Sequence, residues 1–330
     1  MPQVHTALNT LLNNHLTLSA AQISQGSISH NYIRDLLVNR NERDSSFPLF
    51  VDGDFLSGSY ARGTKIFPLN DIDVMMVMDG TGLIPLDKGQ YLNAEVRGSG
   101  EQGNPILQHF GENGLLSSKK VLELFRDVLM ESHPMSKIKE DGQAVNVWLD
   151  SYKLGIDVVP CFHIVPSDGS QDFYYIPAGN DKDYWLKTNP KIDEKISENY
   201  QKYHNNQFSG LVRLLKHWNR DYNAERLQSY HLETLSWYVF SGIPTKIQHY
   251  GDALNFFFEN VTQYLAIACP DATKLGDPID QYLSPENRQK TLQRIAETSS
   301  LINTVSMLGL GNPERKLKAW KSVLGDKFVI

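Results

Sequence analysis

The sequence predicts an α+β protein of two lobes, in which an N-terminal half combines strands with helices and a C-terminal half is helical. Three observations support this prediction. Apolar runs typical of strands, DIDVMMVM and GIDVVPCF, occur before Pro166. From about residue 191 to the end, nearly every segment has helical periodicity. The chain has 330 residues, 41% of them hydrophobic, which is long enough for two domains that share one cleft.

The N-terminal half begins with predicted helices over residues 4–40, with a break near residues 26–28. IRDLLVNR, inside this region, has the apolar spacing of an amphipathic helix. FLSGS then predicts a short strand that runs into a turn. ARGTKIFPLN predicts a loop or short helix closed by Pro68, and DIDVMMVM predicts a strand ended by Asp79 and Gly80.

The middle of the chain predicts an insertion, a helix and a hairpin. Residues 79–116 are rich in Gly, Asn, Asp and Pro, and we expect them to form an exposed insertion. SSKKVLELFRDVLMESHP has serine caps at its start and a proline just past its end, which predicts a helix. AVNVWLD and GIDVVPCF are joined by the tight link SYKLG, so they predict a β-hairpin.

Beyond Pro166 the chain becomes aromatic and then helical. FYYIPAGNDKDYWLKTNP has loop signals throughout, whereas FSGLVRLLKHWNRDY has one apolar stripe at residues 208, 211, 212, 215 and 218. Further helices are predicted for LETLSWYVFSG, DALNFFFENVTQYLAIA, PENRQKTLQRIAETSSLINTV and NPERKLKAWKSVL. The predicted domains are therefore residues 1–190, a sheet-containing core with N-terminal helices, and residues 191–330, a helical domain.

Composition argues against several classes of protein. The net charge is −6, whereas a dedicated binder of double-stranded nucleic acid is usually basic. The two cysteines, Cys161 and Cys269, form no CxxC pattern, so we expect reduced thiols in a cytoplasmic protein. We find no signal peptide and no apolar run of about 18 residues, so no membrane span is expected. No GxSxG elbow supports hydrolase chemistry.

Two carboxylates lie inside the apolar run DIDVMMVM. Residues two apart on a strand face the same side, roughly 6.6–6.8 Å apart, so Asp71 and Asp73 share one face. Their mutual repulsion and burial would cost free energy unless a divalent cation lies between them. Mg²⁺ is the fitting ion, because it takes oxygen ligands and keeps waters and phosphates in its shell. The alternative is a solvent-facing strand end with ordinary acidic residues.

A third carboxylate, Asp157, lies in the apolar strand GIDVVPCF. If that strand is beside DIDVMM in one sheet, three carboxylates converge. Such a set suits two Mg²⁺ ions about 3.5–4 Å apart, which clamp the attacking and leaving oxygens of a phosphoryl transfer. The alternative is an edge-strand aspartate.

A Gly-Ser pair precedes the first aspartate by a short loop. Gly58 allows close approach of the backbone, and the turn offers unpaired N–H groups to an anion. Ser59 can donate its hydroxyl to a phosphate oxygen. The ordered set is a Gly-Ser turn, then DxD, then a later aspartate on a second strand, and this order is more specific than any one of its parts.

These residues resemble a known family. LSGSYARGTKI, NDIDVMMV and GIDVVPCF are similar to the three-part signature of DNA polymerase β-like nucleotidyltransferases. The resemblance implies a mixed sheet flanked by helices, Mg²⁺ ligands on two acidic strands, and a Gly-Ser turn that holds the triphosphate. GLVRLLKHWNRDY followed by SYHLETL resembles a segment shared by the oligoadenylate synthetases, cyclic GMP–AMP synthase and the bacterial CD-NTases. All the matching motifs together span residues 55 to 240.

The narrower resemblance implies roles for three residues of the helical half. Lys216 and Ser229 would contact the triphosphate, and Tyr230 would stack on a base. A solvated lysine and a core tyrosine are the alternatives. Arg62 and Lys65 either meet the triphosphate or lie on a solvated helix face. Trp185, Tyr174 and Tyr175 either line a base pocket or pack where the lobes meet.

The resemblance implies an enzyme that uses NTPs, ATP among them, and two Mg²⁺ to make a cyclic di- or trinucleotide with release of pyrophosphate. It further implies bacterial anti-phage signalling through an effector protein that senses the product, without an obligatory long nucleic acid; an activating protein partner stays an open possibility. Two alternatives remain at this point. One is a template-independent polymerase or oligoadenylate synthetase with linear products, and the other is a non-catalytic nucleotide-binding module.

Overall fold

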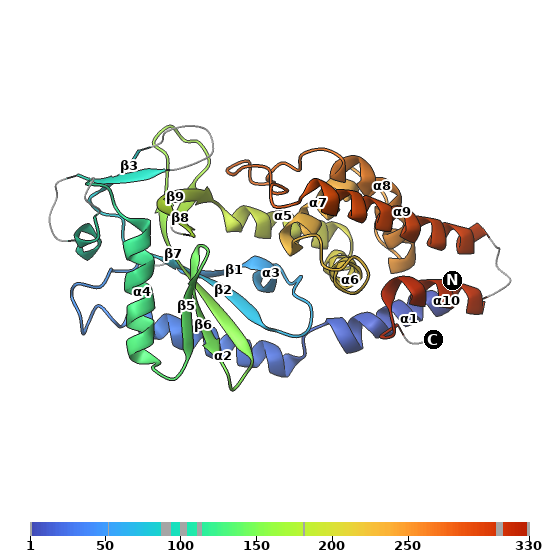
Figure 1. The fold of residues 1–330 in the computed structure, drawn as a ribbon, viewed down its shortest axis with the longest axis horizontal. Coiled ribbons are helices and arrows are strands. Elements are labelled where there is room, and N and C mark those ends of the chain that lie inside the picture. The colour runs from blue at the N-terminus through green and yellow to red at the C-terminus, as the bar shows by residue number, and fades with distance from the viewer. Residues whose placement is uncertain are drawn as a thin grey trace.

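The computed structural model describes residues 2–51, 53–86, 94–99, 104–110, 114–180, 182–307 and 313–328. The first half of the chain combines both kinds of element (Figure 1): α1 (Pro2–Leu11), a π-helical turn (Leu12–Leu16), α2 (Ala20–Val38), β1 (Phe55–Ser57), α3 (Gly58–Ala61), β2 (Asp71–Val77), β3 (Leu83–Leu86), β4 (Glu95–Gly98), a 3₁₀ turn (Pro105–Gln108), α4 (Ser118–Ser132), β5 (Lys137–Asp141), β6 (Ala144–Leu149), β7 (Leu154–Ile164), β8 (Phe173–Gly179) and β9 (Lys182–Thr188).

The second half of the described chain is helical, as the periodicity of its sequence predicts (Figure 1). Its helices are α5 (Pro190–Tyr203), α6 (Phe208–Asp221), α7 (Ser229–Phe240), α8 (Tyr250–Leu265), α9 (Pro285–Met307) and α10 (Pro313–Leu324). In the described part of the chain, no helix is long and apolar enough to cross a membrane.

One mixed sheet of seven strands organises the first lobe. Its main path runs β1-β2-β7-β6-β5, and β8 continues from β7 to β9. β2 and β7 pair in parallel, whereas the other neighbours are antiparallel. The predicted hairpin of β6 and β7 is confirmed, and β7 joins it to the acidic strand β2.

The sheet buries one face against α2 and α4 (Figure 1). Alternate residues of β2, namely Ile72, Val74 and Met76, are fully buried in this core. The α4 helix begins where predicted, because the Ser117 hydroxyl accepts a hydrogen bond from the Lys120 N–H at 3.1 Å. The opposite face of β2 presents Asp71 and Asp73, which are only partly buried.

A second hydrophobic core lies in the helical lobe, and the first helix belongs to it. Leu8, Leu11 and Leu16 are fully buried there, beside helices that come more than 190 residues later. Figure 1 accordingly draws α1 next to α10, with both chain ends at the helical lobe. The boundary predicted at residue 190 stays a prediction, but residues 4–16 pack with the C-terminal core.

The break expected near residues 26–28 is wrong, since α2 runs through it. The helices separate instead at residues 17–19, where Ser19 and Gln22 form a reciprocal capping box. Gly26 is needed for packing. A Cβ there would approach Ile72 and Leu69 side chains to 3.0 Å, so the missing side chain lets α2 lie close to the sheet.

Five more strands were not expected from the sequence. FYYIPAGNDKDYWLKTNP forms β8 and β9 rather than loops, with a turn at Gly179 and Asn180, both of which have positive φ. KIKED forms the edge strand β5. The insertion expected over residues 79–116 contains the small β3–β4 sheet and buries Ala94, Val96 and Ile106. Residues 87–93, 100–103 and 111–113 of it lie outside the described residues.

Candidate active site

The three predicted aspartates share one face of the sheet. Asp73 lies opposite Asp157 in the parallel β2–β7 pair, and Asp71 lies opposite Gly155. Paired residues on neighbouring strands point to the same side, about 5 Å apart. The prediction that β7 would bring a third carboxylate beside the DxD strand is therefore confirmed.

Burial makes this face costly for negative charge. Burial first, and then the neighbouring Asp157 carboxylate, raise the pKa of Asp73 above its ordinary value. Burial also raises the pKa of Asp157, while the Asn146 side chain opposes this by donating a hydrogen bond of 2.7 Å to Asp157 Oδ1. Positive charge nearby therefore favours the ionised forms of this pair.

A lysine supplies part of that charge in this structure. The Lys65 ammonium forms an ion pair with Asp71 Oδ1. Burial, followed by repulsion from Lys216, lowers the pKa of Lys65 to about 8, so its proton is held less firmly than that of an ordinary lysine. Lys65 thus faces the carboxylates and not solvent, which excludes the solvated helix face considered from the sequence.

The donor atoms of this face are of the kind that a hard divalent cation prefers, although they are not arranged around a single point. Among the described residues, no group of three or more His, Cys, Asp or Glu side chains is poised to hold a metal ion as it stands. Asp71, Asp73 and Asp157 offer carboxylate oxygens, the ligands that Mg²⁺ prefers. Lys65 would have to leave Asp71 Oδ1 for that oxygen to become a ligand.

The Gly-Ser turn touches the site directly. Gly58 begins α3 with a φ of 68°, in the left-handed region. A Cβ at this position would lie 1.8 Å from Asp73 Oδ2, so the close approach that Gly58 permits is that of a carboxylate. The carbonyl of Ser59 accepts hydrogen bonds from the Thr64 and Lys65 N–H groups at 2.9 Å, and this fold-back carries Lys65 to Asp71.

A buried charge cluster joins the turn to the helical lobe. Glu233, on α7, is only 1% exposed and binds Lys216 Nζ of α6 at 2.7 Å. Its other oxygen, Oε2, lies 2.9 Å from Arg62 Nε in the loop after α3. Lys216 also donates to the Thr64 hydroxyl at 3.4 Å. Lys216 is therefore buried at the contact between the lobes, and not solvated at the border of its helix.

This cluster combines two cations with one carboxylate. Although burial opposes it, the attraction of Lys216 and Arg62 lowers the pKa of Glu233 to about 2, so Glu233 stays ionised. Lys216 pairs with the Glu233 carboxylate, which also binds Arg62. Burial lowers the pKa of Lys216. Arg62 and Lys216 thus share one carboxylate, and Asp193 is a further acidic neighbour of Arg62.

Comparison with known proteins finds relatives along nearly the whole chain, although no family model matches it. A relative from Bacillus cereus (strain VD146), named "Probable cyclic nucleotide synthase IK1_05630", is 26% identical over 98% of this chain and 97% of its own. A "Cyclic AMP-AMP-AMP synthase" from Acinetobacter sp. (strain ATCC 27244 / 9458) is 23% identical over 94% of this chain and 81% of its own.

Solved structures agree in fold. CdnC of E. coli MS115-1, solved with ATP, has a TM-score of 0.70 at 16% identity and covers 99% of both chains. The same CdnC in a complex with HORMA-deltaN has a TM-score of 0.69 at 16% identity, covering 99% of this chain and 98% of that one. The chain therefore has the fold of the CdnC structures, and its curated relatives are named as cyclic nucleotide synthases, which are nucleotidyltransferases.

The predicted base-contacting residue of this nucleotidyltransferase, Tyr230, is tied into the same region. Its hydroxyl lies 2.9 Å from Asp193 Oδ1 and 3.2 Å from Asp271 Oδ1, so its proton serves one carboxylate at a time. The Arg62 guanidinium lies 5.5 Å from the centre of its ring. Ser229 is exposed at the first position of α7. Contact of either residue with a nucleotide stays a prediction.

Three aromatic residues considered for a base pocket are packing residues in this CD-NTase-like fold. Trp185 is fully buried, and Tyr174 and Tyr175 are each 1% exposed. Side chains this enclosed have no surface to offer a base, so packing between strands explains them.

Sequence reasoning missed two polar residues of the nucleotidyltransferase site. Asn146 interrupts the apolar run AVNVWLD, and that interruption is a signal that it faces the aspartates. Glu233 is the acidic residue of SYHLE, but its role depends on Arg62, which lies 171 residues away. No local pattern reports a partner so distant.

Proposed function

We propose that this nucleotidyltransferase joins NTPs into a cyclic di- or trinucleotide, with release of pyrophosphate. The observation that carries the proposal is the β2–β7 register, which aligns Asp73 with Asp157 and leaves Asp71 on the same face. Asp73 also lies against Gly58 of the Gly58–Ser59 turn. The names of both curated relatives, each a cyclic nucleotide synthase, support a cyclic product.

The chemistry is a displacement at phosphorus. The oxygen of a ribose hydroxyl bonds to the α-phosphorus of a second NTP, the bond from that phosphorus to the bridging oxygen breaks, and pyrophosphate leaves with that oxygen. Two Mg²⁺ ions, held by Asp71, Asp73 and Asp157, would supply charge stabilisation to the attacking and leaving oxygens. Because Asn146 occupies Asp157 Oδ1, Asp157 Oδ2 is the atom that can take the hydroxyl proton.

The triphosphate of the donor NTP binds where positive charge and N–H groups gather. Gly58 and Ser59 begin α3, and the cations Arg62 and Lys216 of the cluster around Glu233 lie next to that turn. Lys216 and Ser229 then contact phosphate oxygens, and Tyr230 stacks on a base. The buried pairing of Lys216 with Glu233 means that phosphate must share this lysine or draw it away.

The relatives suggest the wider setting. Since one relative is named for a product made of AMP units and CdnC was solved with ATP, we place ATP among the substrates. CdnC was also solved with a HORMA protein, which supports an activating protein partner for this enzyme. The product would act as a second messenger in bacterial anti-phage defence, sensed by an effector protein.

The decisive experiment is incubation with all four labelled NTPs and Mg²⁺ or Mn²⁺, followed by mass spectrometry. We expect a product resistant to both phosphatase and exonuclease. A linear product would instead indicate an oligoadenylate synthetase-like polymerase. If no NTP and neither metal gives pyrophosphate, even with a HORMA-type partner added, the non-catalytic alternative replaces the proposal.

The metal assignment is tested by Asp71→Ala with Asp73→Ala. We expect the double variant to lose turnover by at least about 10³-fold, because both ligands shared by the ions are gone. Its thermal unfolding should remain close to that of the wild type, since two repelling and partly buried charges are removed. A double variant that forms product at the wild-type rate would show that these carboxylates hold no catalytic metal.

A further inference from the structure

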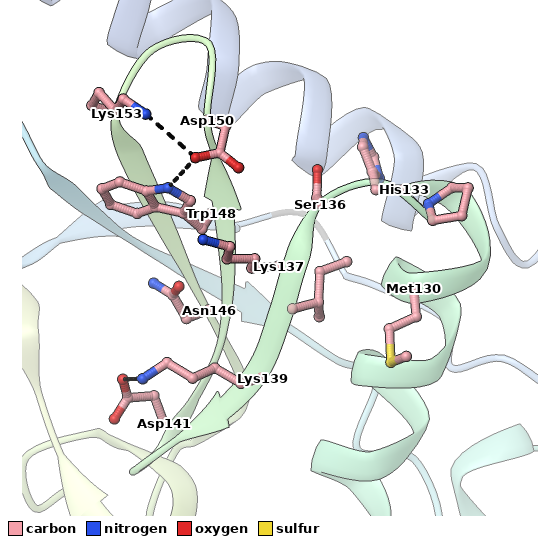
Figure 2. A pocket seen from close by; sticks show the side chains of 12 residues that line it. Met130, His133, Ser136, Lys137, Lys139, Asp141, Asn146, Trp148, Asp150 and Lys153 are labelled. Carbon is pink, nitrogen blue, oxygen red and sulfur yellow. Dashed lines mark hydrogen bonds and ion pairs between the residues drawn. The ribbon is translucent and has the colours of Figure 1, made fainter.

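A hollow of about 900 Å³ lies against the edge strand β5 (Figure 2). Its walls include Lys137 and Lys139 of β5, Asn146 and Trp148 of β6, and Lys153 of the following turn. Asn146 lines the hollow and also donates its hydrogen bond to Asp157 Oδ1. The hollow therefore begins where the row of carboxylates ends.

Strand register places the lysines, Asn146 and Trp148 of the hollow on the same face of the sheet as the aspartates, whereas Ile138 and residues at the end of α4 line its other side. Lys139 is opposite Asn146, Asn146 is opposite Asp157, and Asp157 is opposite Asp73. A second row, one pleat along, contains Lys137, Trp148, Gly155 and Asp71. Each row therefore runs from a lysine on the edge strand to a carboxylate at the centre of the site.

Trp148 is a fixed and accessible aromatic surface on this face. Its indole N–H donates to Asp150 Oδ1 at 3.1 Å, which holds one edge of the ring (Figure 2). A Cβ at Gly155, its neighbour on β7, would lie 3.6 Å from Trp148 Cε3, so the ring lies close over the backbone there. The side chain is only partly buried, and a planar ligand could stack on it.

The lysines around this ring are loosely engaged. The hydrogen bond from the indole N–H lowers the pKa of the exposed Asp150 carboxylate, and the charge of Lys137 helps to lower it further. Lys139 binds Asp141 at 2.6 Å with both side chains about three-fifths exposed, and Lys153 lies 3.5 Å from Asp150. Exposed pairs of this kind contribute little stability, so a phosphate can replace the carboxylate as partner.

Reaction geometry decides which nucleotide this hollow suits. An in-line displacement needs the attacking oxygen opposite the leaving group, across the transferred phosphorus. The leaving pyrophosphate belongs with the Gly58–Ser59 turn, which follows β1 on one side of β2. The attacking nucleotide must then approach from the other side of Asp73, over β7 and β6, where Trp148 and the lysines lie.

We infer that this hollow binds the attacking nucleotide, with its base on Trp148 and its 5′-phosphates on Lys137 and Lys139. The inference rests on the proposed function for the identity of the reaction, but not for the binding itself. Trp148, Lys137 and Lys139 are then specificity and positioning residues for one of the two substrates, separate from those that grip the donor triphosphate.

Two nucleotide analogues separate the subsites. The α,β-methylene analogue of an NTP that the enzyme consumes cannot donate, because its α–β bridge is not cleaved, but its ribose hydroxyls can attack. The 2′,3′-dideoxy analogue can donate but cannot attack. With both present, one dideoxynucleotidyl group passes to the methylene analogue and pyrophosphate leaves, so the KM of each partner can be measured alone.

We expect Trp148→Ala, and Lys137→Ala with Lys139→Ala, to raise the KM of the methylene analogue about 5- to 100-fold, as the loss of one stacked base or of phosphate contacts would. The KM of the dideoxy analogue should change less than about twofold. Trp148→Phe, which keeps a stacking ring, should recover most of the affinity. Lys290→Ala is the matched control, because Lys290 is also an exposed lysine in an ion pair within one element.

The outcomes are separable from those of the proposed function. Equal KM values in wild type and variants, or an equal rise for both analogues, overturn the subsite while leaving the nucleotidyltransferase intact. If the wild type forms no product, tryptophan fluorescence with α,β-methylene-ATP in EDTA still decides. A saturable quench that Trp148→Phe abolishes supports the subsite, and the absence of a quench overturns it.

Discussion

At the scale of single residues, a glycine leaves the space that the Asp73 carboxylate occupies. Gly58 has a φ of 68°, and the space that its missing side chain leaves is filled by Asp73 Oδ2. Turn and carboxylate are therefore fitted to each other before any nucleotide binds. The sequence predicts both residues, but it attributes the glycine to anion binding alone.

Gly58→Ala should therefore displace Asp73. We expect turnover to fall by at least about 100-fold, because a displacement of roughly 1 Å in a catalytic group has an effect of that size. The positive φ should add a loss of about 1 kcal/mol in the free energy of unfolding. Pyrophosphate release and urea denaturation measure the two effects separately.

Gly63 offers a matched control for Gly58. Its φ is 65°, and nothing lies within 4 Å of where its Cβ would be. Gly63→Ala therefore introduces the same backbone strain without touching Asp73. Equal losses of turnover in the two variants would mean that strain in the loop matters and the contact with Asp73 does not.

The carboxylates were predictable because they obey a local rule, and their partners were not. Two residues apart on a strand is enough to place Asp71 and Asp73 on one face. Lys65 reaches Asp71 only because the loop folds back on the Ser59 carbonyl. Such a fold-back depends on tertiary packing, which no periodicity in the sequence encodes.

At the scale of elements, one buried carboxylate ties α6 and α7 to the loop after α3. Glu233→Gln removes the carboxylate that Lys216 and Arg62 share, and Asp193 remains as an acidic neighbour of Arg62. Breaking a buried pair from one side costs about 3–5 kcal/mol, so we expect a loss of that size in the free energy of unfolding. Chemical denaturation at pH 7.5 measures it.

The control for this variant is an exposed ion pair of similar chemistry. Glu297 binds Arg294 on α9, and both side chains are more than one-third exposed. Glu297→Gln should change the free energy of unfolding by less than about 0.5 kcal/mol. If Glu233→Gln were equally mild, water or a rearranged Asp193 would have to neutralise the two cations.

Helices and strands were predictable where the apolar periodicity of the sequence agrees with the surface that the element packs against. β2, β7 and α4 have strong apolar periods and occupy the places that those periods require. β8 and β9 were missed because their aromatic residues pair across a turn at Asn180, within a segment that also contains Gly and Pro. KIKED was missed because an edge strand tolerates charges on both faces.

At the scale of the whole molecule, the two lobes are joined by the chain itself and by polar contacts. The first helix, α1, packs in the C-terminal core, whereas the next helix, α2, packs against the sheet of the first lobe. Amphipathic spacing shows that α1 buries one face, but not which core receives it. The assignment of residues 4–16 therefore needed three-dimensional contacts.

Two buried groups of the helical lobe should give the molecule opposing responses to pH. Burial lowers the pKa of His231 to about 4, so it folds uncharged, with its Nδ1 2.9 Å from the Tyr282 hydroxyl. Burial raises the pKa of Asp193 to about 7. Between pH 6.5 and 4 the unfolded chain takes up a proton at His231 and the folded chain does not, so this group destabilises the fold as pH falls. Below pH 7 the folded chain takes up a proton at Asp193 before the unfolded chain does, so this group stabilises the fold as pH falls.

Single variants should separate the two responses. His231→Gln removes the acid-sensitive term, so the stability that the wild type loses through this group between pH 6.5 and 5, about 2 kcal/mol, should disappear. Asp193→Asn removes the opposing term, so its stability should fall more steeply than that of the wild type as pH drops from 7 to 5. Urea denaturation at half-unit pH intervals measures both slopes. Parallel curves for the wild type and both variants would mean that neither group changes its protonation on folding.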